Sequence, residues 1–196
     1  MKNSEEKRIF VYKLVTDNGG APCVHEGLLS LAICKPAIRA SAHIGDLVFG
    51  FGGKPLVGRL IYIAVVTEKE CNGDYYSQQK HLRRPDCIYA WKNGKLHLKK
   101  GAKFHAEGLQ AYKDVGTAPT YKKGAVLLSR DFRYLGREGD DSYQHSYRAI
   151  TACLDCLRQG HRVNHSPALH EELLKLKDEI WKKSRAKRVG DPTHSD

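Results

Sequence analysis

The stretch that decides the fold is "GDLVFGFGGKPLVGRLIYIAVVTEKE", residues 45–70, in which two apolar runs flank a glycine-rich connection. In the first run Leu47, Phe49 and Phe51 alternate with smaller residues, so they share one face of a strand. The second run, residues 56–70, is the longest strand signal in the chain. The two runs predict a β-hairpin, and the glycines within it indicate a bulge or a close approach by another backbone or a ligand.

Further strand signals lie on both sides of this hairpin. Residues 8–15, "RIFVYKLV", are rich in β-branched and aromatic residues and predict a strand. Asn93-Gly94 predicts the tip of a second hairpin within residues 87–100. Residues 125–136 predict one strand or two short ones. Residues 26–36, "EGLLSLAICKP", are ambiguous, and we expect a helix there because Leu28, Leu31 and Ala32 share a face and Pro36 would end it.

The last third of the chain is typical of amphipathic helices. Residues 144–160 carry apolar side chains at helical spacing. In residues 165–184, Ser166 is suited to cap a helix and Pro167 to occupy its first position. The apolar stripe of this second helix consists of Leu169, Leu173, Leu176, Ile180 and Trp181.

Strands first and helices last predict the α+β class, with a mostly antiparallel sheet or a small barrel followed by C-terminal helices. We expect an N-terminal tail over residues 1–7, a single domain over 8–181, and a frayed basic C-terminal tail over 182–196.

Composition narrows the possible classes of function. The 196 residues include 41% hydrophobic residues, as in a folded domain, and the net charge of +11 favours a polyanionic partner. Neither a membrane span nor a signal peptide is visible, so we expect a cytoplasmic protein whose six cysteines are reduced. The chain lacks the P-loop motif and GxGxxG, which disfavours ATP hydrolysis and dinucleotide chemistry. We expect no cofactor.

The residues in these segments also resemble a known family. Residues 11–53, together with "DCIY" (86–89), "VLLSRDFRYLG" (126–136) and "GHRVNHS" (160–166), are similar to the nucleotide-modification-associated domain of the second type. That family occurs in prokaryotes and phages and is associated with DNA base-modification systems. The resemblance covers residues 8–181 and implies a modification context, with possible modification-enzyme partners, rather than a defined reaction.

A second likeness concerns the hairpin alone. Residues 45–66 look like the central strands of PUA-like barrels, including the EVE and ASCH groups, which hold a flipped or modified base in a pocket. This resemblance implies a barrel pocket whose rim includes Gly50, Gly52 and Gly53.

The loop "TDNGGAPCVH", residues 16–25, is the candidate site. If a helix began near Glu26, its dipole and His25 would favour a Cys23 thiolate, with Asp17 orienting the histidine. The alternative is a rigid turn with a buried, inert thiol. Between these lies ligand contact without catalysis. The candidate ligand-binding residues are Asp17, Asn18, Gly19, Gly20, Cys23, Phe49, Phe51 and Gly52.

Other polar residues allow weaker interpretations. Cys153, Cys156, His161 and His165 are of zinc-binding types, but their spacing departs from the common finger pattern, so we expect no metal. Asp46, His105 and Asp114 are typical of turns and caps. Basic clusters near aromatic residues indicate nucleic-acid contact, and the candidates for it are Lys80, Arg83, Arg84, Lys99, Lys100 and Arg162.

The leading hypothesis from the sequence is a protein of base-modification systems that recognises a modified base or nucleotide in a barrel pocket. The first alternative is an enzyme acting on a nucleotide or DNA base through Asp17, Cys23 and His25. The second is a subunit of a modification complex that docks a protein partner through the C-terminal helix.

Overall fold

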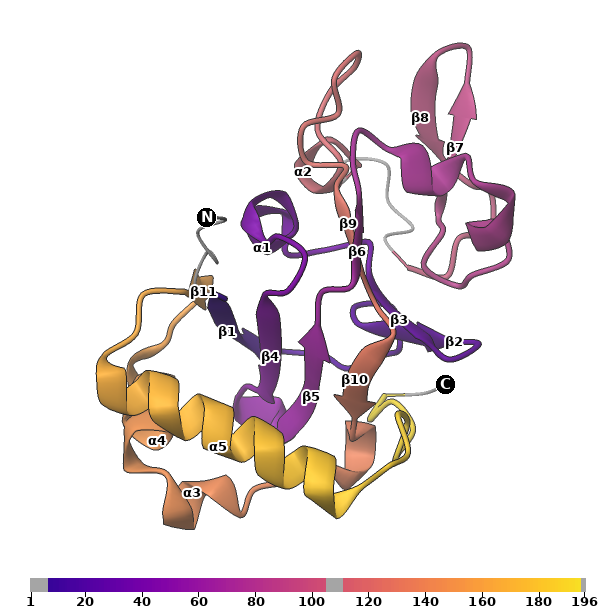
Figure 1. Ribbon diagram of the computed structural model, residues 1–196. Helices are drawn as coiled ribbons and strands as arrows, with labels where there is room; N and C mark the ends of the chain where they lie inside the picture. Colours follow the sequence, from indigo (N-terminus) through magenta and orange to yellow (C-terminus); the bar gives the residue numbers. More distant parts are fainter. Residues whose placement is uncertain (1–6, 105–110, 195–196) are drawn as a thin grey trace, which may run out of the picture.

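The structure, a computed structural model, describes residues 7–104 and 111–194, which form two sheets, a hairpin and five helices (Figure 1). The first sheet has the order β10-β5-β4-β1-β11 and the second the order β2-β3-β9-β6. The strands are β1 (Ile9–Leu14), β2 (Cys23–His25), β3 (Leu28–Leu31), β4 (Leu47–Gly52), β5 (Leu60–Val65), β6 (Glu68–Glu70), β7 (Tyr89–Lys92), β8 (Lys95–Leu98), β9 (Val126–Ser129), β10 (Asp131–Tyr134) and β11 (His161–Arg162). The α+β class is confirmed.

The central hairpin of the first sheet is formed as the alternating pattern predicts. Strands β4 and β5 pair antiparallel, with a register shift between Gly50 and Phe51. A Cβ atom at Gly50 would lie 2.2 Å from the Tyr62 ring, so this glycine is required for close packing. The β1–β4 pairing is parallel, whereas every other pairing between named strands is antiparallel.

The two sheets are joined by strands that continue from one into the other. The chain passes from β5 into β6 after two residues, and from β9 into β10 after one. No pairing between described strands closes the sheets into a barrel. The expected barrel is therefore not formed, because β6, β2, β10 and β11 remain as sheet edges in the described part of the chain.

Helices α3 (Tyr143–Ser146), α4 (Arg148–Cys156) and α5 (Pro167–Lys183) gather on one face of the first sheet (Figure 1). Phe49 and Phe51 share a buried cluster with the α5 stripe residues Leu173 and Leu176. Ser166 caps α5 by accepting a hydrogen bond from the Leu169 backbone N–H, with Pro167 at the first turn. The prediction of two C-terminal amphipathic helices is thus confirmed.

The predicted helix over residues 26–36 is wrong. Glu26 and Gly27 have φ angles of 48° and 72°, which form a tight turn between the hairpin strands β2 and β3. Leu28 to Leu31 are all buried, so the apolar run is a two-sided core strand. Pro36 begins helix α1 (Pro36–Ser41) instead of ending a helix.

A separate lobe is formed by the segment between β6 and β9. It contains the hairpin β7–β8, whose turn at Asn93 and Gly94 has φ angles of 51° and 69°, and helix α2 (Ala111–Asp114). Tyr75, Tyr76 and Tyr89 form its buried centre. Figure 1 shows this lobe on the opposite side of the molecule from α3, α4 and α5.

The C-terminal tail is ordered along β10 rather than frayed. The Tyr134 N–H donates to the Lys187 carbonyl and the Val189 N–H donates to the Tyr134 carbonyl, each at 2.8 Å. Arg188 forms a parallel bridge with Tyr134. The expectation of a frayed tail is therefore wrong for residues 187–194, because the tail satisfies backbone groups at an edge strand.

Candidate functional site

Asp17 is a structural anchor of the candidate loop. Its carboxylate is 1% exposed and accepts hydrogen bonds from the Tyr134 hydroxyl at 2.7 Å and from the Thr193 N–H at 3.2 Å. The His194 N–H donates to the Asp17 carbonyl at 2.8 Å. Among the described residues no hydrogen bond joins Asp17 to His25. Asp17 therefore holds the loop to the C-terminal tail.

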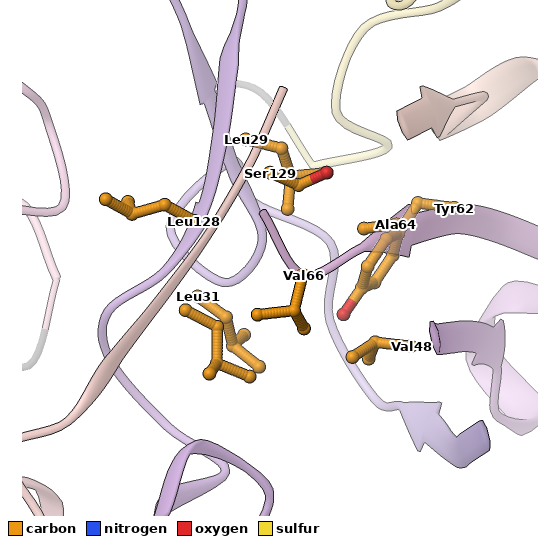
Figure 2. A pocket seen from close by; sticks show the side chains of 9 residues that line it. Leu29, Leu31, Val48, Tyr62, Ala64, Val66, Leu128 and Ser129 are labelled. Carbon is orange, nitrogen blue, oxygen red and sulfur yellow. The ribbon is translucent and has the colours of Figure 1, made fainter. Parts of the chain in front are cut away.

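The aromatic residues expected in a barrel pocket lie in the core. Phe49 and Phe51 are fully buried and stack on each other at 6.2 Å between ring centroids. Figure 2 shows the seam between the two sheets, lined mainly by aliphatic side chains such as Leu29, Leu31 and Val66. Its free volume is about 10 Å³, room for one water at most. The barrel pocket expected from the sequence is thus absent from the described residues.

Cys23 lies on strand β2 and not before a helix. It is 1% exposed, and burial together with the nearby Asp86 carboxylate raises the pKa of the thiol to about 12. The helix that would have favoured a thiolate begins at Pro36. The Arg84 guanidinium binds the carbonyl oxygens of Cys23 and His25 at 3.1 and 3.0 Å, which fixes this strand. The argument for an activated nucleophile therefore has no basis in the fold.

This burial predicts the order in which the thiols react. Cys71 and Cys156 are exposed, whereas Cys23 and Cys87 are buried. We expect iodoacetamide at pH 8 to modify Cys71 and Cys156 first and to leave Cys23 intact until the protein unfolds, because the thiolate is the reactive form. Peptide mass spectrometry after timed quenching measures this order. Rapid labelling of native Cys23 would restore the nucleophile hypothesis.

An open cavity of about 360 Å³ adjoins the candidate loop, within the size range of about 300–1,000 Å³ typical of small-molecule sites. We call it the Asn18–Lys35 cavity. Its apolar wall is formed by Leu14, Val15, Ala21, Ile33 and Phe104, and its polar groups come from Thr16, Asn18, Cys34, Lys35 and Lys103. It lies at the end of β1, where the first sheet gives way to the loop and the lobe.

Lys35 is the cation positioned most firmly in this cavity. Its ammonium lies 4.8 Å from the centroid of the Tyr12 ring and 3.4 Å from the Lys13 carbonyl oxygen. Cys34 and Lys35 have φ angles of 58° and 45°, an uncommon conformation for non-glycine residues. Burial lowers the pKa of Lys35. Backbone strain and a partly buried charge are both features that occur at functional sites.

The buried guanidinium of Arg39 stabilises the strained turn at Cys34 and Lys35. Arg39 is fully buried, and its Nε donates to the Cys34 carbonyl at 2.6 Å. The same side chain forms an ion pair with Asp114 at 2.7 Å and binds the Ala125 carbonyl at 2.6 Å. The cavity is therefore preorganised by a network that links α1, α2 and the residue preceding β9.

The loop glycines shape the other wall. A Cβ atom at Gly20 would lie 2.8 Å from the Phe104 ring, and one at Gly19 would lie 3.0 Å from Pro192. The Asn18 side-chain oxygen accepts from the Gly20 N–H at 3.1 Å, which fixes the amide. The cavity thus combines an aromatic wall, a fixed amide and a cation.

Of the ligand-binding candidates expected from the sequence, Asn18 lines this cavity, whereas its other lining residues Cys34, Lys35 and Phe104 were not among the candidates. Two signals were available. "CKP" places a lysine directly before a helix-initiating proline, and Arg39 follows four residues later in the helix. The assignment of residues 26–36 to a helix concealed both.

Two other hollows have less suitable chemistry. One of about 600 Å³ lies between Arg8, His165 and Glu171, where the Glu171 carboxylate would repel an anionic ligand. One of about 280 Å³ lies beside Gly52, Lys54 and Asp155. Gly52, expected in the ligand site, lines this last hollow and packs on Leu56.

The residues considered for zinc have other roles. Cys153 is buried in the core cluster, and His165 forms a hydrogen bond to the Ile9 carbonyl through Nε2 at 2.7 Å. No group of three metal-binding side chains occurs in residues 7–104 and 111–194. Asp46 accepts hydrogen bonds from the Arg8 and His43 backbone N–H groups, which is a turn role. His105 lies outside the described residues.

The basic candidates divide into buried and exposed residues. Arg84 is 5% exposed and is saturated by Tyr75, Ser30 and backbone carbonyls. Arg84 is therefore not accessible to a nucleic acid at the surface. Lys80 is half-exposed and pairs with Glu70 at 3.3 Å. Arg83, Lys100 and Arg162 are exposed, and Lys99 is partly buried.

Comparison with known proteins identifies the family. The family model described as nucleotide modification associated domain 2 matches residues 6–195, nearly the whole chain. The chain belongs to this family. It therefore has a general role associated with nucleotide modification, and the matched range includes the ordered C-terminal tail.

No curated protein and no solved structure matches the chain. Within the described residues, no helix has both the length and the apolar character needed to span a bilayer.

Proposed function

We propose that this member of the nucleotide modification associated domain 2 family recognises a base or nucleotide, with the Asn18–Lys35 cavity as the binding site. The observation that carries the proposal is the convergence of an aromatic wall, a fixed amide and a half-buried ammonium in one cavity of suitable volume. The site replaces the barrel pocket expected from the sequence.

Each group in the cavity suits one part of a nucleotide. Phe104, which is 7% exposed and packed against Gly20, gives the cavity an apolar aromatic wall against which a base would pack. The Asn18 amide, whose Nδ2 group has no hydrogen-bond partner among the described residues, donates to a base edge or sugar oxygen. The Lys35 ammonium binds phosphate as a compact charge. The proposed activity is recognition rather than bond cleavage, because the candidate nucleophile Cys23 is buried and burial raises the pKa of its thiol to about 12.

The proposal keeps the cytoplasmic setting expected from the sequence, where nucleotides are available. A cytoplasmic setting is also compatible with the six cysteines, since none of them forms a disulfide in the described structure. A modification enzyme that presents or consumes the nucleotide remains the expected partner.

The test is titration with deoxynucleoside monophosphates, plain and base-modified, followed by calorimetry. We expect Lys35→Met to weaken binding by about 10- to 100-fold, because a hydrogen bond to a charged group contributes about 1.5–3 kcal/mol. Lys54→Met is the matched control, since Lys54 is an exposed lysine that lines a different hollow. Loss of binding in Lys54→Met with none in Lys35→Met would place the site elsewhere.

The same titration carries a pH prediction. Burial lowers the pKa of Lys35, so its ammonium loses the proton at a lower pH than an ordinary lysine. Affinity for a phosphate should therefore fall as pH rises through that lowered pKa, and the decline should disappear in Lys35→Arg, which stays charged. An identical pH profile for the wild type and Lys35→Arg contradicts a phosphate contact at Lys35.

A further inference from the structure

The positive charge of the chain is concentrated in the lobe that borders the cavity. Residues 71–124 contain eleven Lys and Arg against four Asp and Glu, which is seven of the eleven net positive charges in little more than a quarter of the chain. We call its described part, residues 71–104 and 111–124, the lysine lobe. Such an imbalance is the electrostatic footprint of a polyanion site.

The acidic side chains of the lysine lobe do not offset this charge at its surface. Asp86 and Asp114 are buried and paired with Arg84 and Arg39. Asp74 is therefore the one exposed carboxylate in the described part of the segment. The exposed charge of the lysine lobe is consequently almost entirely positive.

Packing within the lobe fixes where several lysines lie. Lys92 and Lys95 flank the turn of the hairpin β7–β8. The segment that carries Lys122 and Lys123 is held against this hairpin by Tyr121, whose hydroxyl accepts from the Leu96 N–H at 2.8 Å and whose ring meets Trp91 at 5.2 Å. These four lysines are exposed and belong to one packed unit.

Two aromatic side chains of the lysine lobe are exposed. Trp91 is 36% exposed and Tyr112 is 52% exposed. Aromatic faces between basic side chains are the arrangement that binds unpaired bases along a single strand. A duplex would leave such faces without stacking partners.

The lysine lobe is continuous with the cavity. Lys103 and Phe104 belong to the lobe and line the Asn18–Lys35 cavity. Asp114 of the lobe binds Arg39, which in turn holds the Cys34 carbonyl at the cavity floor. Lys103 and Phe104 thus connect the lysine lobe to the cavity, and Asp74 is the one exposed carboxylate in the described part of the lobe.

We infer that the ligand of the cavity is one nucleotide of a single-stranded nucleic acid whose backbone is bound by the lysine lobe. This inference rests on the proposed function and names its substrate class. Phosphates contact the lobe lysines, bases stack on Trp91 and Tyr112, and one unpaired nucleotide enters beside Lys35. No covalent step is involved.

The test is anisotropy of a fluorescent single-stranded DNA oligonucleotide titrated at several salt concentrations. The lobe variant carries Lys92→Gln, Lys95→Gln, Lys122→Gln and Lys123→Gln. Its control carries Lys54→Gln, Arg148→Gln, Arg158→Gln and Lys182→Gln, which removes the same charge from exposed positions outside the lobe. The slope of log affinity against log salt is negative. We expect its magnitude to fall by roughly 0.7 for each phosphate that the lobe variant no longer binds, and to change little in the control.

Mononucleotide binding measured in parallel separates the two proposals. We expect the lobe variant to bind a deoxynucleoside monophosphate as the wild type does, while Lys35→Met weakens both ligands. The lobe inference is overturned if the mononucleotide binds but the single strand binds no more tightly. It is also overturned if the lobe variant and its control lose affinity for the strand equally. In both cases the proposal that the cavity binds a nucleotide is retained. Tighter binding of duplex than of single strand also overturns the lobe inference. Failure of the mononucleotide to bind overturns the proposed function instead.

Discussion

Replacing Arg39 with methionine is expected to lower the free energy of unfolding by about 3–5 kcal/mol, because it leaves the Asp114 carboxylate buried without its partner. Arg39 is fully buried and donates to Cys34, Lys123, Ala125 and Asp114. The carbonyl oxygens of these residues also lose their donor. Urea unfolding followed by circular dichroism measures the change.

Arg130→Met is the matched control for this substitution. Arg130 pairs with Glu68 at 3.0 Å on the surface, where both side chains are substantially exposed. Its loss should cost less than about 1 kcal/mol, since exposed ion pairs contribute little. Equal effects for the two variants would show that the Arg39 network does not organise the fold around Cys34 and Lys35.

Replacing Phe49 with alanine is expected to cost about 3–5 kcal/mol of stability while leaving nucleotide affinity unchanged. Phe49 is fully buried between the first sheet and the helices, in the cluster that contains Leu173 and Leu176. It lies on the opposite face of β4 from Val48 and the seam between the sheets. The variant thus separates the core role that the structure gives this ring from the pocket role expected from the sequence.

Unfolding and nucleotide titration must be measured together for Phe49→Ala. Because the free energy of unfolding of a domain is about 5–15 kcal/mol, enough of the variant should stay folded at low temperature for titration. Phe49→Leu offers a milder loss at the same position if it does not. A weakened nucleotide affinity in a variant that is still folded would return Phe49 to the binding site.

Much of the fold was predictable because several local signals agree with tertiary packing. Alternation in residues 47–51 predicted that Leu47, Phe49 and Phe51 share one face, and Asn93-Gly94 predicted a hairpin tip. Ser166 and Pro167 predicted where α5 begins. In each case the local preference and the burial of an apolar face lead to the same structure.

The failures occurred where local signals were ambiguous. The run at residues 28–31 is buried on both faces, so its apolar pattern has neither the strand nor the helix period. Its form depends on pairing with β2 and β9. The ordering of residues 187–194 depends on Tyr134 and Asp17, which are distant in sequence. Barrel closure likewise depends on non-local pairing that no motif specifies.

The candidate site was predicted only in part for a related reason. "TDNGG" marked a loop that does border the cavity, through Asn18. The opposite wall comes from Cys34, Lys35 and Phe104, which are brought together by Arg39 and by packing of the lysine lobe. Residues united only by tertiary contacts leave no spacing pattern in the sequence.

The most direct measurement is a titration of isotope-labelled protein with a deoxynucleoside monophosphate, followed by backbone amide resonances. Binding in the Asn18–Lys35 cavity predicts the largest shifts at Asn18, Cys34 and Lys35, with saturation. It also predicts little change at Asn164 or Gly58, each of which lines a different hollow among the described residues. Saturable shifts centred on either of those residues, or none at Asn18 and Lys35, would contradict the proposal that this cavity recognises a nucleotide.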